Sequence, residues 1–257
     1  MIPKNIFQTH KSKEYIYNNQ KLNNAVNSWQ KHTDFKYHFY ADDQCEQFIQ
    51  NNFNKSVYKA YMKLPLVVMK ADLWRYCIIY CYGGIYADTD TICRVNPNIF
   101  INDSLLTIVP EPDKIHLCQW VFAAQKGSPF LKSIIDLSVK RILTIKEIKE
   151  IKNEHIVHYL TGPGVFTNGI ENYLLKINYP VFTSNRKNYY NYPKPELNVF
   201  NCDNFHKNLV IHLFAGSSND GWKKERDKLL TMQISHDITY KSVFWPIKPH
   251  NIQFFQM

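Results

Sequence analysis

Residues 70–90 read Lys-Ala-Asp-Leu-Trp-Arg-Tyr-Cys-Ile-Ile-Tyr-Cys-Tyr-Gly-Gly-Ile-Tyr-Ala-Asp-Thr-Asp, and this stretch decides the fold. Its first part is an almost wholly apolar helix pattern, which a glycine pair ends before a short strand begins. The strand leads into Asp88 and Asp90, whose i, i+2 spacing places both carboxylates on the same side of an extended chain. Two carboxylates beside a glycine turn form an oxygen-rich corner for a hard divalent cation holding a phosphate-bearing ligand. The residues alone therefore predict a metal–diphosphate site.

Two opposite charges interrupt the apolar helix, on Asp72 and Arg75. Their i, i+3 spacing makes both side chains project from one helix face. One interpretation is a local ion pair, which contributes little when it is exposed. The other is a functional pair, because burying charges without partners costs several kcal/mol, on the order of a whole protein's stability margin. We favour the functional interpretation.

The rest of the chain alternates apolar strands with amphipathic helices, which predicts an α/β fold with one mainly parallel sheet flanked by helices. Besides the short strand between Gly83-Gly84 and the two carboxylates, the expected strands are 2–8, 35–40, 105–109, 116–123 and 208–214. The expected helices are 21–32, 42–53, 56–62, 65–82, one beginning at 128, one ending near 175, and 221–231. Residues 145–160 are predicted to form a solvated helix and 183–207 an irregular surface segment. We find no repeat or linker and expect a single domain over residues 1–257.

A formal net charge of +9 raises the question of nucleic-acid binding. The lysines are dispersed, however, and no run of five basic residues or nucleic-acid-binding motif is visible. We therefore disfavour nucleic acid as a partner. A basic surface is equally suited to attracting a nucleoside diphosphate.

The expected compartment is the cytoplasm. Residues 1–9 already resemble a core strand and leave no visible secretory signal, and charges break the apolar segment 64–82 too often for a bilayer span. We therefore expect a soluble protein with no membrane anchor in this chain, although the sequence alone does not distinguish a whole protein from a trimmed one. Six cysteines lack regular spacing and are expected to be buried, reduced thiols: Cys45, Cys77, Cys81, Cys93, Cys118 and Cys202.

A family resemblance adds to this interpretation. The decisive positions follow one another in the order Asp72, Arg75, Gly83-Gly84, Tyr86, Asp88 and Asp90. This order closely resembles the sugar-binding region of family 32 glycosyltransferases, which include Golgi α-mannosyltransferases and α-hexosaminyltransferases and are related to the large glucosylating toxins. Residues 2–9 are similar to the family's opening strand, 161–163 to an internal Thr-Gly-Pro, and 210–217 to its closing segment.

The resemblance implies a GT-A-type fold and a retaining hexosyltransferase, which moves a hexose from a nucleoside diphosphate sugar to a glycan or protein acceptor. Retention rests wholly on the family. No residue can be named as a nucleophile. Two mechanisms therefore stay open: departure of the nucleotide and attack by the acceptor on the same face of the sugar, or formation of a covalent intermediate. A UDP-sugar is preferred as donor, with a GDP-sugar as the alternative because some relatives use GDP-mannose. The expected cofactor is Mn²⁺ or Mg²⁺.

The resemblance also suggests roles for individual residues. Asp90 would bind the metal directly, Asp88 the ribose or the metal through water, and His212 would be the third protein ligand. Asp72 would hold hydroxyls of the donor sugar, and Arg75 would reach the sugar or the phosphate. Asp72, Arg75, Asp88 and Asp90 are therefore the predicted catalytic residues.

The donor site is expected to draw further residues from three segments. The first strand ends where a nucleotide-binding loop belongs in such a sheet. At 216–218 the closing segment has Gly-Ser-Ser where the family usually has Gly-Ser-Trp. The contact to the leaving phosphate is therefore open among Ser217, Ser218 and Trp222. The additional donor-binding residues are Gln8, Thr9, His10, Gly84, Tyr86, Ser217, Ser218 and Trp222. The family commonly has Trp at the position of His10, so base stacking there is an open question, and Trp120 is expected in the core.

Two other function classes remain as alternatives. Residues 88–91, Asp-Thr-Asp-Thr, can also be interpreted as the aspartyl-phosphate motif of haloacid dehalogenase-type phosphatases, with Asp88 as the nucleophile. That motif normally follows an N-terminal strand, whereas here it lies behind a long helix. A non-enzymatic sugar- or nucleic-acid-binding module would bind without metal-dependent turnover.

Overall fold

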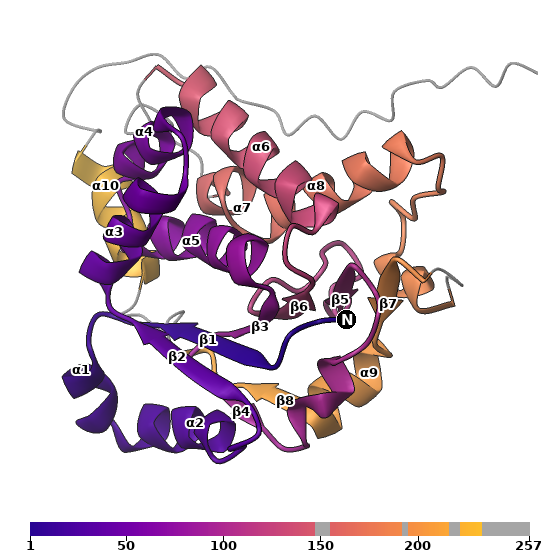
Figure 1. The fold of residues 1–257 in the computed structure, drawn as a ribbon. Helices are drawn as coiled ribbons and strands as arrows, with labels where there is room; N and C mark the ends of the chain where they lie inside the picture. Colours follow the sequence, from indigo (N-terminus) through magenta and orange to yellow (C-terminus); the bar gives the residue numbers. More distant parts are fainter. Residues whose placement is uncertain (147–154, 192–194, 216–221, 233–257) are drawn as a thin grey trace, which may run out of the picture.

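A six-stranded sheet forms the centre of the computed structural model, which describes residues 1–146, 155–191, 195–215 and 222–232 (Figure 1). β1 pairs in parallel with β2 and β3, and β5 pairs in parallel with β7. β6 runs antiparallel to both of its neighbours, β3 and β5. In spatial order the strands are β2 (Lys36–Tyr40), β1 (Asn5–Thr9), β3 (Gly84–Ala87), β6 (Val121–Ala124), β5 (Leu106–Ile108) and β7 (Leu197–Val199). The predicted α/β fold with a mainly parallel sheet is confirmed.

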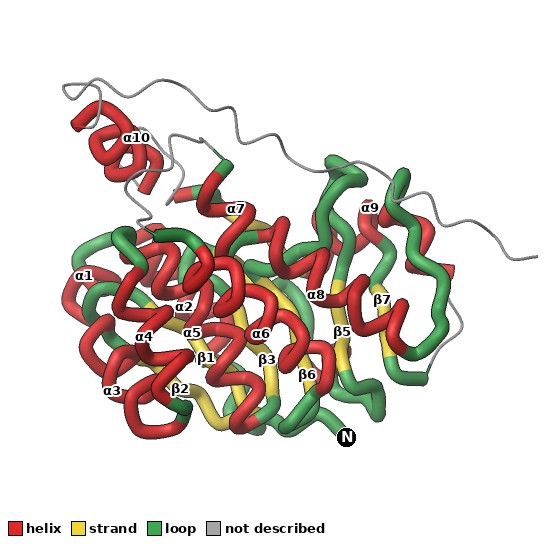
Figure 2. Tube along the Cα trace, turned by 90° about the horizontal axis from the view of Figure 1, so that it is seen from above, coloured by secondary structure: helices red, strands yellow, loops and turns green. Residues whose placement is uncertain are grey.

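Helices cover one face of the sheet, as the views from the side and from above show (Figures 1 and 2). The opposite face carries two helices and a small second sheet. The covering helices are α3 (Asp42–Asn52), α4 (Lys55–Lys63), α5 (Val67–Tyr82), α6 (Pro129–Thr144) and α8 (Pro163–Lys176). The opposite face holds α1 (Lys13–Tyr17), α2 (Gln20–Gln30), β4 (Thr91–Cys93) and β8 (Val210–His212). Because both faces of the sheet are covered, its central strands are apolar on both sides.

The register of β1 against β3 places alternate residues in the two cores. Phe7 lies opposite Tyr86 and packs into the core under α5, whereas Ile6 lies opposite Ile85 and packs into the core toward α2. Both strands point the same way, so their carboxyl ends meet at one edge of the sheet. Polar residues that follow these strands are therefore brought together at that edge.

The helix α5 is buried around most of its circumference, which explains its nearly continuous apolar sequence. It ends at Gly83, whose φ of 67° is a left-handed conformation and whose N–H donates to the Ile79 carbonyl at 2.8 Å. Gly84 follows with a φ of 120°, and a Cβ there would lie 2.7 Å from the Asn5 carbonyl oxygen. The glycine pair therefore permits both the turn and the close approach of β3 to β1.

Some sequence-based expectations differ from the structure. The strand expected at 116–123 is confined to β6, because residues 116–120 form a loop. In this loop the Leu117 N–H donates to Thr167 and the Gln119 side chain donates to Asp72. The segment 183–207 was expected to be irregular, yet it supplies β7 to the main sheet by pairing with β5. In the segment expected to form a solvated helix, α7 (Ile156–Leu160) is largely buried against α8, and residues 147–154 lie outside the described residues.

The remaining elements are short or peripheral. The helix α10 (Trp222–Met232) agrees with the predicted C-terminal helix, and the single-turn α9 (Cys202–Asn204) precedes β8. All six cysteines are free, and five of them are buried. Over the residues that the structure describes, no helix combines the length and the apolar character needed to cross a bilayer.

Replacing Gly84 with alanine should destabilise the fold strongly. The backbone of the alanine would have to keep an unfavourable positive φ, and its methyl group would also collide with β1. We therefore expect a loss of about 2–4 kcal/mol in the free energy of unfolding. Gly127→Ala is the matched control, since its φ is 73° but a Cβ there meets nothing within 4 Å. That control should lose only about 1 kcal/mol. Urea unfolding of both variants measures the difference, and equal losses would contradict the proposed close approach.

Candidate active site

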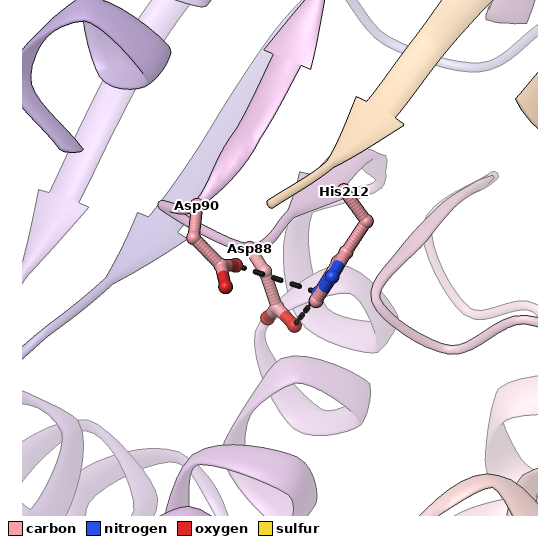
Figure 3. Close-up of side chains that lie close together, drawn as sticks. All are labelled: Asp88, Asp90 and His212. Carbon is pink, nitrogen blue, oxygen red and sulfur yellow. Dashed lines mark ion pairs between the residues drawn. The ribbon is translucent and has the colours of Figure 1, made fainter. Parts of the chain in front are cut away.

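Three potential metal ligands meet at the carboxyl edge of the sheet (Figure 3). Asp88 directly follows β3, and Asp90 lies in the turn between β3 and β4. His212 comes from β8, whose antiparallel pairing with β4 sets Thr91 opposite His212. The small second sheet therefore carries a residue from the C-terminal part of the chain to the two carboxylates.

The three side chains point toward one another (Figure 3). His212 Nε2 lies 3.5 Å from an Asp90 oxygen and 3.8 Å from an Asp88 oxygen. Each residue offers one ligand atom, and these atoms all lie within 4.8 Å of one another. Two carboxylates and an imidazole are donors that Mn²⁺ accepts readily, so the residues present fit the divalent cation that the DXD motif implies.

Backbone amides that follow β8 hold this group in place. The Leu213 N–H donates to the Asp90 carbonyl at 2.8 Å, and the Ala215 N–H donates to the Asp90 carboxylate at 2.9 Å. Between them, the Phe214 N–H donates to His212 Nδ1 at 3.0 Å, in a backbone with φ of 55°. Because Nδ1 accepts here, Nε2 of the neutral ring carries the proton and faces the carboxylates. For Nε2 to bind a cation, the proton would have to move to Nδ1 and replace the hydrogen bond from Phe214. Trp120, expected only in the core, is buried but also contacts the His212 ring at 4.8 Å between centroids.

A buried guanidinium connects the DXD carboxylates to the helix α5. Arg75 Nη2 lies 3.0 Å from an Asp72 oxygen and 3.2 Å from an Asp88 oxygen. The Arg75 and Asp72 side chains are only 5% and 2% exposed. The ring of Tyr86 lies 4.6 Å from the guanidinium carbon, and its hydroxyl donates to Asp88. The predicted pair of charges is therefore a buried network rather than a surface ion pair.

The two acidic partners of Arg75 differ in their proton affinity. Burial raises the pKa of Asp72 to about 6, and the attraction of Arg75 only partly opposes this effect. Burial also raises the pKa of Asp88, but Arg75 and His212 outweigh it and hold the Asp88 pKa below its usual value. Asp88 is therefore ionised at neutral pH, while Asp72 titrates closer to neutrality.

Two residues beside Asp72 were missed from the sequence. Gln119 Nε2 donates to one Asp72 oxygen at 3.2 Å, and Thr161 Oγ1 donates to the other at 3.1 Å. Tyr76 joins them, since its hydroxyl contacts the Gln119 side chain and the Thr161 carbonyl. Thr161 belongs to the Thr-Gly-Pro match, so a sequence signal existed for it, whereas Gln119 stands in a loop with no pattern of its own.

Of the three residues predicted at the end of β1, Gln8 and His10 are placed to contact a ligand, whereas Thr9 is not. Gln8 lies at the site, because its amide donates to the Asp88 carbonyl at 3.1 Å and accepts from Tyr37 at 2.8 Å. His10 stacks on Tyr15 with ring centroids 4.6 Å apart. Thr9 instead points to the Tyr40 carbonyl and Cys45, which indicates a structural role.

The other donor-site candidates are more scattered. Gly84 serves the backbone turn described above. Trp222 is half-buried, packs against the core under α5 and lies beneath the Arg226 guanidinium, whose carbon is 5.6 Å from its ring centroid. Ser217 and Ser218 lie outside the described residues.

Buried polar side-chain atoms without a hydrogen-bond partner concentrate at this edge. Among the described residues, five buried side-chain polar atoms lack a partner, and three of them are His10 Nδ1, Trp74 Nε1 and Arg75 Nε. Trp74 packs between Tyr40 and Tyr86, with ring centroids 5.1 and 6.4 Å away. Buried polar groups are nearly always satisfied in a folded protein, so this concentration is typical of a place where a polar ligand binds.

Residues 7–107 match the family described as "Glycosyltransferase sugar-binding region containing DXD motif". The chain thus carries a glycosyltransferase sugar-binding region. This match confirms the resemblance and the glycosyltransferase class that the sequence predicted.

Similar proteins share part of the chain. The initiation-specific α-1,6-mannosyltransferase of Candida albicans is 29% identical over 68% of this chain and 54% of its own length. The inositol phosphoceramide mannosyltransferase 3 of Schizosaccharomyces pombe is 31% identical over 52% of this chain and 36% of its own length. A solved structure, the PaToxG glycosyltransferase, is 16% identical and aligns over 69% of this chain and 72% of its own, with a TM-score of 0.48. The chain therefore spans about half the length of the first mannosyltransferase.

The buried carboxyl of Asp72 should make stability depend on pH. Its folded pKa of about 6 lies above the ordinary 3.8, so its contribution to stability is present below pH 3.8 and is lost as the pH rises through 6. A shift of about two units corresponds to about 3 kcal/mol. In urea unfolding with chelator, the wild type should lose stability relative to Asp72→Asn between pH 4 and pH 7. The exposed Asp136→Asn is the control, and a pH-independent difference for Asp72→Asn would contradict the assignment.

Proposed function

We propose that this protein is a divalent-metal-dependent glycosyltransferase that moves a hexose, with mannose as the first candidate, from a nucleoside diphosphate sugar to a hydroxyl acceptor with retention of configuration. One observation carries the proposal. The DXD carboxylates and His212 meet within ligand distance, and Arg75 joins them to the buried Asp72. This arrangement sets a cation site next to a polar corner that can hold a sugar.

The residues divide into two working parts. Asp88, Asp90 and His212 would hold the cation, which when bound supplies Lewis-acid stabilisation of the departing diphosphate. Arg75 keeps Asp88 ionised through the ion pair at 3.2 Å and retains a buried Nε donor for the ligand. Asp72 offers carboxylate oxygens to sugar hydroxyls. Because both oxygens already accept from Gln119 and Thr161, a hydroxyl would share or displace these partners.

The nucleotide is assigned to the carboxyl ends of β1 and β2. His10 and Tyr15 supply a stacked aromatic pair there, and His10 Nδ1 is a buried polar atom without a partner. Such a pair is suited to contact with a planar base. A UDP-sugar was preferred from the sequence, with a GDP-sugar as the alternative. Because two relatives are named mannosyltransferases, the donor panel should include both UDP-sugars and GDP-mannose. One relative is named for the acceptor inositol phosphoceramide and the other only for the α-1,6 linkage, so we propose only a hydroxyl-bearing glycan or glycoconjugate.

The phosphatase alternative is disfavoured by the surroundings of Asp88. One of its oxygens contacts Arg75 and Tyr86, and the other faces His212. A nucleophilic carboxylate needs an oxygen open to the phosphorus, and the family match covers this same segment. A binding module without turnover would differ from the proposed enzyme in one assay, the release of nucleotide from a panel of donor sugars with and without Mn²⁺.

Asp90→Asn should remove most of the nucleotide release from the preferred donor. The amide keeps the shape of the carboxylate but removes a full negative charge from the cation site, so affinity for Mn²⁺ should also fall. Calorimetric Mn²⁺ titration and the release assay measure both effects, and thermal unfolding should change little. Asp136→Asn again controls for the substitution itself. Undiminished turnover in Asp90→Asn, or in excess chelator, would overturn the metal assignment.

Asp72→Asn should separate sugar transfer from nucleotide binding. A hydrogen bond to a charged group contributes about 1.5–3 kcal/mol, roughly ten- to a hundredfold in rate if it acts in the transition state. Calorimetry with GDP or UDP should show near-normal affinity while transfer collapses. Arg75→Lys should also be costly, because an ammonium cannot reproduce a guanidinium that contacts two carboxylates. An Asp72→Asn variant that retains full transfer would show that the sugar lies elsewhere.

A further inference from the structure

Three histidines and an aspartate gather near Asp72, and the proposed reaction uses none of them. His116 lies in the loop before β6, and His155 and His158 lie at and within the start of α7. The rings of His116 and His158 meet edge to face with centroids 5.6 Å apart, and His155 is 6.2 Å from His158. Asp113 binds His116 Nδ1 at 2.7 Å. Such a concentration of titratable groups beside a candidate sugar site calls for a role.

His116 and His158 lie close in sequence to Gln119 and Thr161, the residues that hold Asp72. His158 precedes Thr161 by three residues, so both side chains lie on one face of α7 and its end. His116 precedes Gln119 by three residues in the neighbouring loop. Thr161 and Gln119 bind the two oxygens of Asp72, so the contacts run from the DXD carboxylates through Arg75 and Asp72 to these two residues. Each of them stands three residues after one histidine of the pair.

Asp113 fixes the tautomer of His116. One Asp113 oxygen accepts the backbone N–H groups of Ile115 at 2.7 Å and of His116 at 2.9 Å. Burial raises the pKa of Asp113, but these hydrogen bonds and the one from His116 Nδ1 outweigh it and lower the pKa to about 2. An ionised carboxylate only accepts hydrogen bonds, so Nδ1 carries the proton. With the proton on Nδ1, Nε2 is the ring nitrogen that can accept a hydrogen bond.

The surroundings favour a neutral ligand group. Burial, together with repulsion from His116, His155 and Arg226, lowers the pKa of His158 to about 4, although Asp113 opposes this effect, so His158 is uncharged at neutral pH. Arg226 of α10 is already paired with Asp227 at 2.8 Å. A phosphate would require uncommitted positive charge at this position. An oriented imidazole acceptor beside a neutral imidazole instead matches a sugar hydroxyl.

We propose that His116 and His158 form the acceptor subsite, in which His116 Nε2 accepts a hydrogen bond from a hydroxyl of the acceptor sugar. This inference rests on the proposed function, because the subsite has meaning only beside a donor sugar held near Asp72. Asp113 is a positioning residue, since it acts by holding the His116 ring and its tautomer. The remaining neighbour, His155, is exposed and is not needed for the contact.

A binding experiment tests the subsite without turnover. In histidine side-chain ¹H–¹⁵N NMR of the full chain with Mn²⁺ and GDP or UDP, methyl α-mannopyranoside is titrated first, followed by the methyl glucoside and galactoside. The Nε2 signal of His116 should move with at least one sugar, while Nδ1 stays protonated. Signals of His116 and His158 that move with no sugar of the panel would overturn the proposal.

Kinetics supply the second test. His116→Gln should raise the KM for the acceptor about three- to tenfold, as expected for one hydrogen bond, with the nucleotide affinity and the acceptor-free nucleotide release unchanged. Asp113→Asn should also raise the KM for the acceptor, but by a smaller factor. His32→Gln, beyond the end of α2 on the other face of the sheet, is the matched control. An unchanged acceptor KM, or an equal loss of acceptor-free release, would refute the subsite, whereas a wild type that releases no nucleotide would refute the proposed function instead.

Discussion

The buried guanidinium of Arg75 is the interaction on which the rest of the site depends. It lies between Asp72 and Asp88 and stacks on Tyr86. The helix α5, the strand β3 and the DXD turn therefore share one positively charged side chain. Removing one partner of such a pair leaves an uncompensated buried charge, which typically costs about 3–5 kcal/mol. The network therefore couples the stability of the α5–β3 unit to the charge of the site.

One guanidinium also distributes charge unevenly between two carboxylates. Asp88 gains enough from Arg75 and His212 to stay ionised, whereas Asp72, which is more deeply buried, has a pKa raised to about 6. The negative charge is thus concentrated where a cation would bind. The more weakly ionised carboxyl lies where sugar hydroxyls are proposed to bind. This division follows from burial and distance alone.

Much of this arrangement could be predicted from residues 70–90. The apolar helix with two charges, the glycine pair and the i, i+2 carboxylates each impose a local geometry, and their order matched a family pattern. Gln119 could not be predicted in this way, because it reaches Asp72 from a loop without periodicity. Thr9 shows the opposite error, since the end of a strand does not tell which side its hydroxyl faces. The strand expected at 116–123 begins only at residue 121, because the preceding residues pair briefly with residues 109–111 and then direct Gln119 to Asp72.

The sequence by itself determined the local elements of this protein: the helix α5, the turn at Gly83-Gly84, and the carboxylates that share one side of the chain. These features depend on neighbours within a few residues, whose spacing is fixed by backbone geometry. Only the tertiary structure decided that β8 pairs with β4 and carries His212 to Asp88 and Asp90. It likewise decided that His116 meets His158 beside the Asp72 corner. Contacts between residues tens of positions apart depend on how whole helices and strands pack, and a local sequence pattern does not specify that packing.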